Sequence, residues 1–267
     1  MYPLVYSLTL LQLSTFCFYS LSMYRSSDLT SGQASLNAHL IRANAATQTY
    51  KIALFNELIS LMRLSESLSV YPAIEWLLEK NRGLGIVHMS SFDGDQPIVL
   101  AISQGNNGLV QLLLGYGADV TSVNRVGYTP LHYAAANKKG TDEQRAALVK
   151  MLLDAGANPK SICKAGNTPL HIAVANNNCI AIIKILLEVD EASANRANNA
   201  RNIPLHYAAR ENNMHVMQLL VDAGANTSCC NDAAMTPLDE GYEKHGEAFR
   251  QTMAFLKLLP HLRVQSD

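Results

Sequence analysis

The chain has 267 residues, 48% of them hydrophobic, so it can bury a sizeable core and is not expected to be disordered overall. Lys and Arg number 21 against 22 acidic residues, which argues against nucleic acid as a partner because phosphate neutralisation needs a basic excess. The cysteines are odd in number and lack paired metal spacing, which favours reduced thiols and a cytoplasmic protein: Cys17, Cys163, Cys179, Cys229 and Cys230.

Residues 1–24 form an apolar N-terminal segment without a charged side chain. The run from Leu4 to Leu21 is compatible with a secretion signal or a membrane anchor. No Lys or Arg precedes the run, and several Ser, Thr and Gln residues dilute it, which favours a helix packed on the rest of the N-terminal region. Both interpretations stay open, so membrane association or export through residues 1–24 is the alternative to a cytoplasmic location.

Residues 25–90 read as a helical N-terminal region. The stretch from Thr30 to Glu66 is predicted to be one long helix, because apolar residues from Tyr50 to Met62 recur at spacings of three and four and no Pro or Gly follows Gly32 within it. Pro72 then begins a short apolar helix containing Ile74, Leu77 and Leu78. This helix is similar to the second half of the repeat that follows, so it is expected to be a degenerate capping copy.

Residues 91–267 contain one pattern repeated about five times. A proline is followed directly by an aliphatic residue and, four residues on, by Ala or Gly, and successive prolines are separated by 33, 39, 35 and 33 residues: Pro97, Pro130, Pro169, Pro204 and Pro237. A fixed period in this range is typical of stacked repeats. The pattern therefore predicts an all-α solenoid of about five helix-turn-helix units.

Each copy carries start and stop signals for its helices. Thr before Pro is a typical helix N-terminus, and Gly105, Asn177 and Asn212 stand eight residues after the proline, where they can end the first helix. The second copy has six extra residues, which we expect to form a solvated, mobile loop around Asn137 to Arg145. A final helix from Phe249 to Leu259 is expected to cap the stack.

Three segments closely resemble the ankyrin repeat, and they do so in register with the Gly-Ala-Asp or Gly-Ala-Asn turns of the copies. They are Thr129-Pro130-Leu131-His132-Tyr133-Ala134-Ala135, Thr168-Pro169-Leu170-His171-Ile172-Ala173 and Ile203-Pro204-Leu205-His206-Tyr207-Ala208-Ala209. The resemblance covers about Ser91 to Leu259. It implies a non-catalytic interaction module, an adaptor that binds a partner protein along the concave face made by turn tips and first helices.

Carried over position by position, the resemblance places partner contacts on the turn tips and on the ends of the first helices. Phe92, Arg125, Tyr128 and Arg210 are the expected anchors, because Tyr and Arg are enriched at interface hot spots. The full set also includes Asp93, Asp95, Val126, Lys164, Asn167, Asn199, Asn202 and Glu211, with Ser103, Gln104, Asn137 and Asn176 on the first helices.

No residue is expected to be catalytic, and no metal or cofactor site is expected. His132, His171 and His206 stand one repeat apart, so the resemblance implies hydrogen bonding within the stack rather than a shared metal. Two alternatives remain: a membrane-tethered or exported bacterial effector-type adaptor, and an enzyme with its active site in the N-terminal helical region. The residues available to such an enzyme are Lys51, Glu57, Arg63, Glu66 and Glu75, which show no recognisable spacing.

Overall fold

The computed structural model describes residues 32–64, 70–176, 179–247 and 249, and every regular element within these ranges is helical. The all-α prediction is confirmed. The chain divides into two compact units, the first ending at Ile86 and the second beginning at Val87. The division into residues 25–90 and 91–267 that the sequence suggests stays a prediction. The expectations for residues 1–24 and for a helix extending to Leu259 lie outside the described residues.

The first unit contains α2 (Gly32–Arg63), α3 (Tyr71–Lys80) and a short 3-10 helix, η2 (Arg82–Leu84). Both predicted helices are therefore present, and the second has its proline in the first turn. Burial follows the helical period, since α2 buries Leu54, Leu58 and Met62 and α3 buries Ile74, Leu77 and Leu78.

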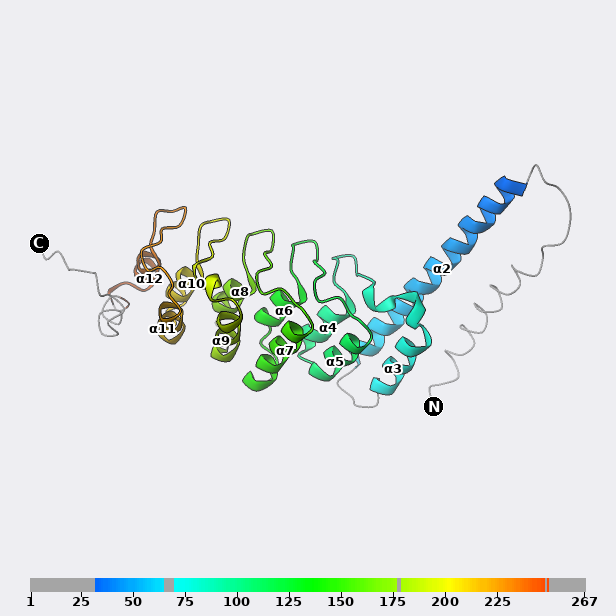
Figure 1. The fold of residues 1–267 in the computed structure, drawn as a ribbon, viewed down its shortest axis with the longest axis horizontal. Helices are drawn as coiled ribbons and strands as arrows, with labels where there is room; N and C mark the ends of the chain where they lie inside the picture. The colour runs from blue at the N-terminus through cyan, green and yellow to red at the C-terminus, as the bar shows by residue number, and fades with distance from the viewer. Residues whose placement is uncertain (1–31, 65–69, 177–178, 248, 250–267) are drawn as a thin grey trace, which may run out of the picture. The chain divides into compact units, whose positions relative to one another are not determined.

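The second unit is a row of helix pairs that lie side by side in chain order, with the connecting loops all projecting to the same edge (Figure 1). The first helices are α4 (Pro97–Gln104), α6 (Pro130–Ala136), α8 (Pro169–Ala175), α10 (Pro204–Arg210) and α12 (Pro237–His245). The second helices are α5 (Asn107–Gly115), α7 (Asp142–Asp154), α9 (Ile180–Val189) and α11 (Met214–Asp222). Two 3-10 helices, η3 (Ile86–His88) and η4 (Glu191–Asn195), complete the described elements.

The repeated positions of the sequence form the core between neighbouring copies. The aliphatic residue after the proline and the alanine four residues after it are at most 2% exposed in each of the first four copies: Ile98, Leu131, Leu170, Leu205, Ala101, Ala134, Ala173 and Ala208. One leucine of each second helix is buried to the same degree: Leu113, Leu152, Leu186 and Leu220. Small residues on the first helix let adjacent first helices approach closely, and the leucines fill the layer between the pairs.

The predicted starts and ends of the first helices hold where they fall on described residues. Each proline stands in the first turn of its helix, and Thr168 and Thr236 accept hydrogen bonds from backbone amides at the helix start. Gly105 and Asn212 follow their first helices with φ of 72° and 52°, as a left-handed C-terminal position requires. Asn177 lies outside the described residues.

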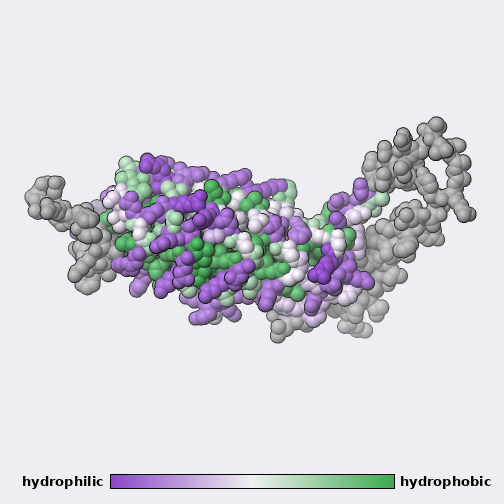
Figure 2. Space-filling model, in the orientation of Figure 1, coloured by the Kyte–Doolittle hydropathy of each residue, from purple (hydrophilic) through white to green (hydrophobic). Residues whose placement is uncertain are grey.

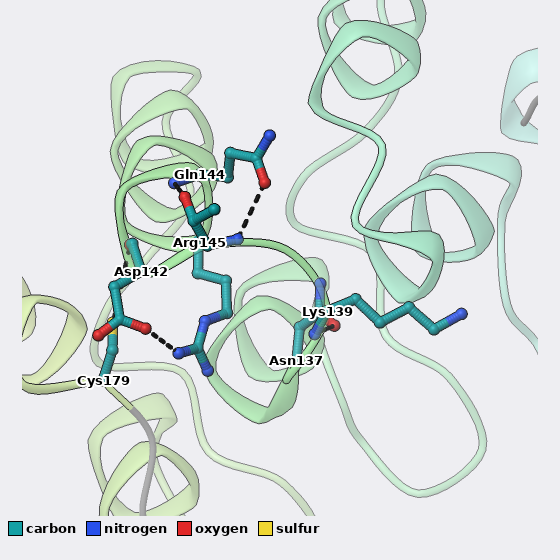
Figure 3. Close-up of polar contacts among 7 residues, drawn as sticks. Asn137, Lys139, Asp142, Gln144, Arg145 and Cys179 are labelled. Atoms are coloured by element: carbon teal, nitrogen blue, oxygen red, sulfur yellow. Dashed lines mark hydrogen bonds and ion pairs between the residues drawn. The ribbon is translucent and has the colours of Figure 1, made fainter.

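The six extra residues of the second copy do not form the mobile loop that the sequence suggested. Residues 142–145 are the first turn of α7, which has 13 residues. Thr141 caps this turn, because its hydroxyl accepts from the Gln144 amide while the Gln144 side chain accepts from the Thr141 amide (Figure 3). Polar residues therefore extend a helix here, and the Thr-x-x-Gln spacing is the signal that was missed.

The insertion is also bound to the preceding copy. The Asn137 side chain donates to the Ile102 carbonyl over 2.8 Å, and the Asn107 side chain donates to the Gln144 carbonyl over 2.7 Å. Asp142 and Arg145 form an ion pair on the new helical turn, whereas the Lys139 side chain points away from it (Figure 3). Residues 138–144 are exposed to solvent, whereas Asn137 is buried and Arg145 is half-buried.

Candidate functional site

The loops between consecutive helix pairs form one continuous surface, which we call the loop edge. It consists of residues 91–96, 124–129, 163–168, 198–203 and 231–236. Each loop closes on itself through a backbone hydrogen bond, such as that from the Asn124 amide to the Tyr128 carbonyl. One further backbone bond joins each loop to the one before it, with N to O distances of 3.0 to 3.2 Å: Arg125 to Asp93, Lys164 to Val126, Asn199 to Ala165 and Asp232 to Ala200.

Six of the expected partner-binding residues are exposed at the tips of the loop edge: Phe92, Asp93, Arg125, Val126, Lys164 and Asn199. Phe92 is 81% exposed, and the Arg125 guanidinium lies 3.9 Å from the centre of its ring. This cation-π contact joins two neighbouring loops while leaving most of the aromatic ring in solvent. Aromatic residues and Arg are both enriched in protein interfaces relative to the rest of the surface.

Arg210 and Glu211, the expected binding residues at the end of α10, already make contacts within the chain. The Arg210 guanidinium lies 4.6 Å from the centre of the Tyr207 ring, and the Arg210 carbonyl accepts from His245 over 2.9 Å. Glu211 is exposed and forms an ion pair with Lys244 at 3.2 Å. Both residues therefore link the last two first helices as well as offering polar groups at the surface.

Three other expected binding residues have side chains that join one loop to the next. Asp95 accepts from the Asn124 amide group over 3.2 Å and from the Tyr133 hydroxyl over 2.8 Å. Asn167 and Asn202 accept in the same way from Asn198 and Asn231, over 2.7 and 2.9 Å. This structural role was not predicted, although the sequence contains a signal for it. Where the residue two positions before a repeat proline is Asp or Asn, the next copy has Asn six positions before its own proline.

In the loop of residues 124–129, Tyr128 occupies the position that is Asp95, Asn167 or Asn202 in three of the other loops. The loop that follows it has the buried Cys163 where three other copies have the bonding asparagine. The Tyr128 ring stacks on His132 and meets Tyr133 edge-on, with centroid distances of 5.3 and 5.7 Å. Burial raises the pKa of the Tyr128 hydroxyl. Because the Tyr128 ring is half-buried against His132 and Tyr133, it offers a partner less surface than the sequence suggested.

The repeated histidines are structural. In His132, His171 and His206, Nδ1 accepts from the backbone amide that precedes the proline, and Nε2 donates to a carbonyl of the following loop over 3.0 to 3.2 Å. These contacts fix the neutral Nε2–H tautomer, because a carbonyl only accepts. Burial lowers the pKa of all three imidazoles, that of His171 to about 4.

The described residues hold no group of three His, Cys, Asp or Glu side chains arranged to bind a metal ion. Within the same ranges, none of the helices combines the length and apolar character needed to cross a bilayer. The residues considered for an N-terminal enzyme lie on the first unit, with Lys51, Glu57 and Arg63 on α2 and Glu75 on α3, and Glu66 lies outside the described residues. Burial raises the pKa of Glu57.

A row of helix pairs with hydrogen-bonded loops along one edge defines the second unit as a helical repeat stack of the interaction-module class. The family model for ankyrin repeats in three copies matches residues 61–158 and 142–231. The chain therefore belongs to the ankyrin repeat family, and the resemblance seen in the sequence is confirmed.

Among curated proteins, the chain is similar to ankyrin repeat protein FPV219 of fowlpox virus, strain NVSL. The two are 29% identical over 148 residues, which make up 55% of this chain and 32% of the viral protein. The chain thus spans about a third of the length of the curated relative it matches.

Proposed function

We propose that this chain is a non-catalytic adaptor that binds a partner protein along the loop edge and the adjoining ends of the first helices. Ankyrin repeats are protein interaction modules, and the family match supports that general role. The observation that carries the specific proposal is the pair formed by Phe92 and Arg125, two residue types enriched in protein interfaces, exposed together on neighbouring loops.

The rigidity of the loop edge also supports the proposal. Backbone bonds join each loop to the next, and the side-chain bonds of Asp95, Asn167 and Asn202 reinforce three of these junctions. A surface held in one conformation before binding loses little conformational entropy when a partner docks. Exposed anchors on such a support suit recognition of a folded or extended protein segment.

The proposal is tested by capture of partners from native cells with the full chain and with a Phe92→Ala/Arg125→Ala variant. Partners of the loop edge should be lost by the variant. The matched control is Lys184→Ala/Val189→Ala, which truncates an exposed cation and an exposed apolar residue on α9. If both variants retain the same partners as the natural chain, with unchanged thermal unfolding, binding does not use this surface.

We further propose a cytoplasmic location for the chain. Cys163, Cys179, Cys229 and Cys230 are free thiols, and Cys230 is exposed. Oxidising compartments favour disulfide formation, so unpaired thiols fit a reducing compartment better. Cell fractionation of the full chain beside a shortened chain beginning at Arg25 tests this, because recovery of only the full chain with membranes would support the tethered alternative instead.

A further inference from the structure

The charges of the loop edge are segregated along the stack. The three middle loops, residues 124–129, 163–168 and 198–203, contain Arg125, Lys164 and Arg201 and no Asp or Glu. The two outer loops contain Asp93, Asp95 and Asp232 and no Lys or Arg. Because the formal net charge of the chain is only −1, this arrangement is a local feature rather than a consequence of composition.

The three cations of the middle loops are not neutralised by the chain itself. Ion pairs in the described ranges join Asp142 to Arg145, Lys160 to Asp190 and Glu211 to Lys244. Among the described residues, no carboxylate lies within ion-pair distance of Arg125, Lys164 or Arg201, all of which are exposed. Their charges are therefore available to a carboxylate from another molecule.

Arg201 occupies a backbone position that disfavours it. The third residue before the proline has a positive φ in every loop, and the first three copies have Gly there. Arg201 adopts φ of 60° at this position. A long side chain in the left-handed region is strained relative to Gly, and strained residues occur most often where function requires their side chain.

Exposed apolar side chains lie beside these cations. Phe92, Val123, Val126 and Ile162 are 81%, 60%, 52% and 54% exposed, and all four belong to the first three loops or directly adjoin them. In Figure 2, hydrophobic residues are interspersed among hydrophilic ones along the edge of the second unit where the loops lie. The surface thus offers positive charge and apolar area together.

We propose that the middle loops recognise an acidic segment of a partner protein that also carries aliphatic or aromatic side chains. This inference rests on the proposed function and names the chemistry of its partner. Carboxylates pair with Arg125, Lys164 and Arg201, while apolar side chains contact Phe92, Val126 and Ile162. Acidic loops on both sides disfavour a uniformly anionic polymer longer than the middle loops, such as RNA, since the flanks would repel its phosphates.

The test uses a phage-displayed library of random peptides of about ten residues, selected on the full chain. Enriched peptides should have a net negative charge and at least one aliphatic or aromatic residue. A fluorescent copy of an enriched peptide should bind roughly tenfold more weakly to an Arg125→Glu/Lys164→Glu variant, and added salt should weaken binding to the natural chain. The matched control is Lys150→Glu/Lys184→Glu, which makes the same charge change on second helices and should bind as the natural chain does.

Enrichment of basic or uncharged peptides, or equal weakening by the two variants, overturns the inference. Tighter binding of a single-stranded RNA of similar length than of the peptide also overturns it. The two proposals can fail independently. If cellular partners are lost through Phe92→Ala/Arg125→Ala but are unaffected by Lys164→Glu, the adaptor proposal is retained and the acidic character of the partner is rejected.

Discussion

At the scale of single residues, each buried histidine joins two copies of the repeat. The His171 ring is 0% exposed and bonds to the Thr168 amide on one side and the Asn202 carbonyl on the other. The neutral imidazole therefore acts as a hydrogen-bonding link between neighbouring loops. Because protonation of the buried imidazole opposes folding, the stability of the stack is expected to depend on pH.

The free energy of unfolding is expected to fall as the pH drops from about 6.5 to 5. Burial lowers the pKa of folded His171 to about 4, while an unfolded histidine titrates near 6.5. Below pH 6.5 the unfolded chain therefore binds a proton at His171 while the folded chain does not. By pH 5 this difference alone lowers the free energy of unfolding by about 2 kcal/mol. Above pH 6.5 neither state is protonated, so this dependence disappears.

Urea unfolding at pH 7 and pH 5 measures this effect, and His171→Gln provides the comparison. The variant should be less stable at pH 7, because Gln does not reproduce both hydrogen bonds, but its stability should change less between the two pH values. Equal pH dependence of the variant and the natural chain would contradict the assigned burial of the imidazole.

Replacement of Arg201 by Gly should stabilise the chain and weaken binding at the loop edge. Release of a non-Gly residue from the left-handed region is worth about 1 kcal/mol. The control is Ala234→Gly, since Ala234 has φ of 59° in the next loop and carries no charge. Both variants should unfold at higher urea concentration, and only Arg201→Gly should lose affinity for an acidic peptide. A destabilised Ala234→Gly would show that the backbone there is not strained.

At the scale of elements, the second copy shows how a polar insertion lengthens a helix. Thr141 and Gln144 satisfy each other's backbone amides, so α7 begins at Asp142, within the inserted segment rather than after it. The lengthened helix also contacts the following copy, where the Cys179 thiol lies 3.9 Å from the Asp142 carbonyl. The insertion is thus part of the stack.

Substitution of Thr141 by Ala is expected to cost about 1 kcal/mol, the usual price of a lost N-cap. Chemical unfolding measures the change, with Lys138→Ala as the control because Lys138 is exposed in the same segment. No difference between the two variants would mean that the first turn of α7 adds nothing to stability and that the insertion behaves as a loop.

The last described helix depends on a glycine for its packing. Gly241 stands where the other copies have Ala, and the Phe249 side chain, 2% exposed, fills the space beside it. A Cβ at this position would overlap the Phe249 ring. The phenyl ring therefore supplies the apolar contact that an additional copy supplies elsewhere in the stack.

Gly241→Ala should lower the free energy of unfolding by about 1 to 3 kcal/mol, because overpacking displaces the ring. Thermal unfolding of the single variant and of Gly241→Ala/Phe249→Leu measures the coupling, since the smaller leucine should recover part of the loss. Additive effects of the two substitutions would show that the residues do not share one space.

At the scale of the whole stack, stability is expected to depend on position, because an interior copy has two neighbours. Leu170 is 1% exposed in the third copy, so Leu170→Ala should cost about 2 to 5 kcal/mol. Leu238→Ala in the terminal copy should cost less, because Leu238 is only half-buried. Equal losses in calorimetry would argue that the copies do not form a nearest-neighbour stack.

The repeat architecture could be predicted from the sequence because its causes are local. The prolines begin helices, the glycines and asparagines end them, and the period of the buried leucines sets which face is apolar, all within a few residues of one another. The buried histidines were likewise assigned correctly, since their spacing of one repeat already separated them. The recurrence of these signals at similar intervals made the stack of helix pairs the expected arrangement.

Only the tertiary structure decided which loop residues face solvent and which face the neighbouring copy. Asp95 and Asn167 bond to residues 29 and 31 positions further along the chain, so the pattern within one copy did not distinguish them from the exposed Asp93 and Lys164, and their role is recognised only when neighbouring copies are compared. The same holds for the cations of the middle loops, which become one charged surface only when the copies lie side by side. Contacts between copies depend on how separate segments meet in space, and that information is not local to any one of them.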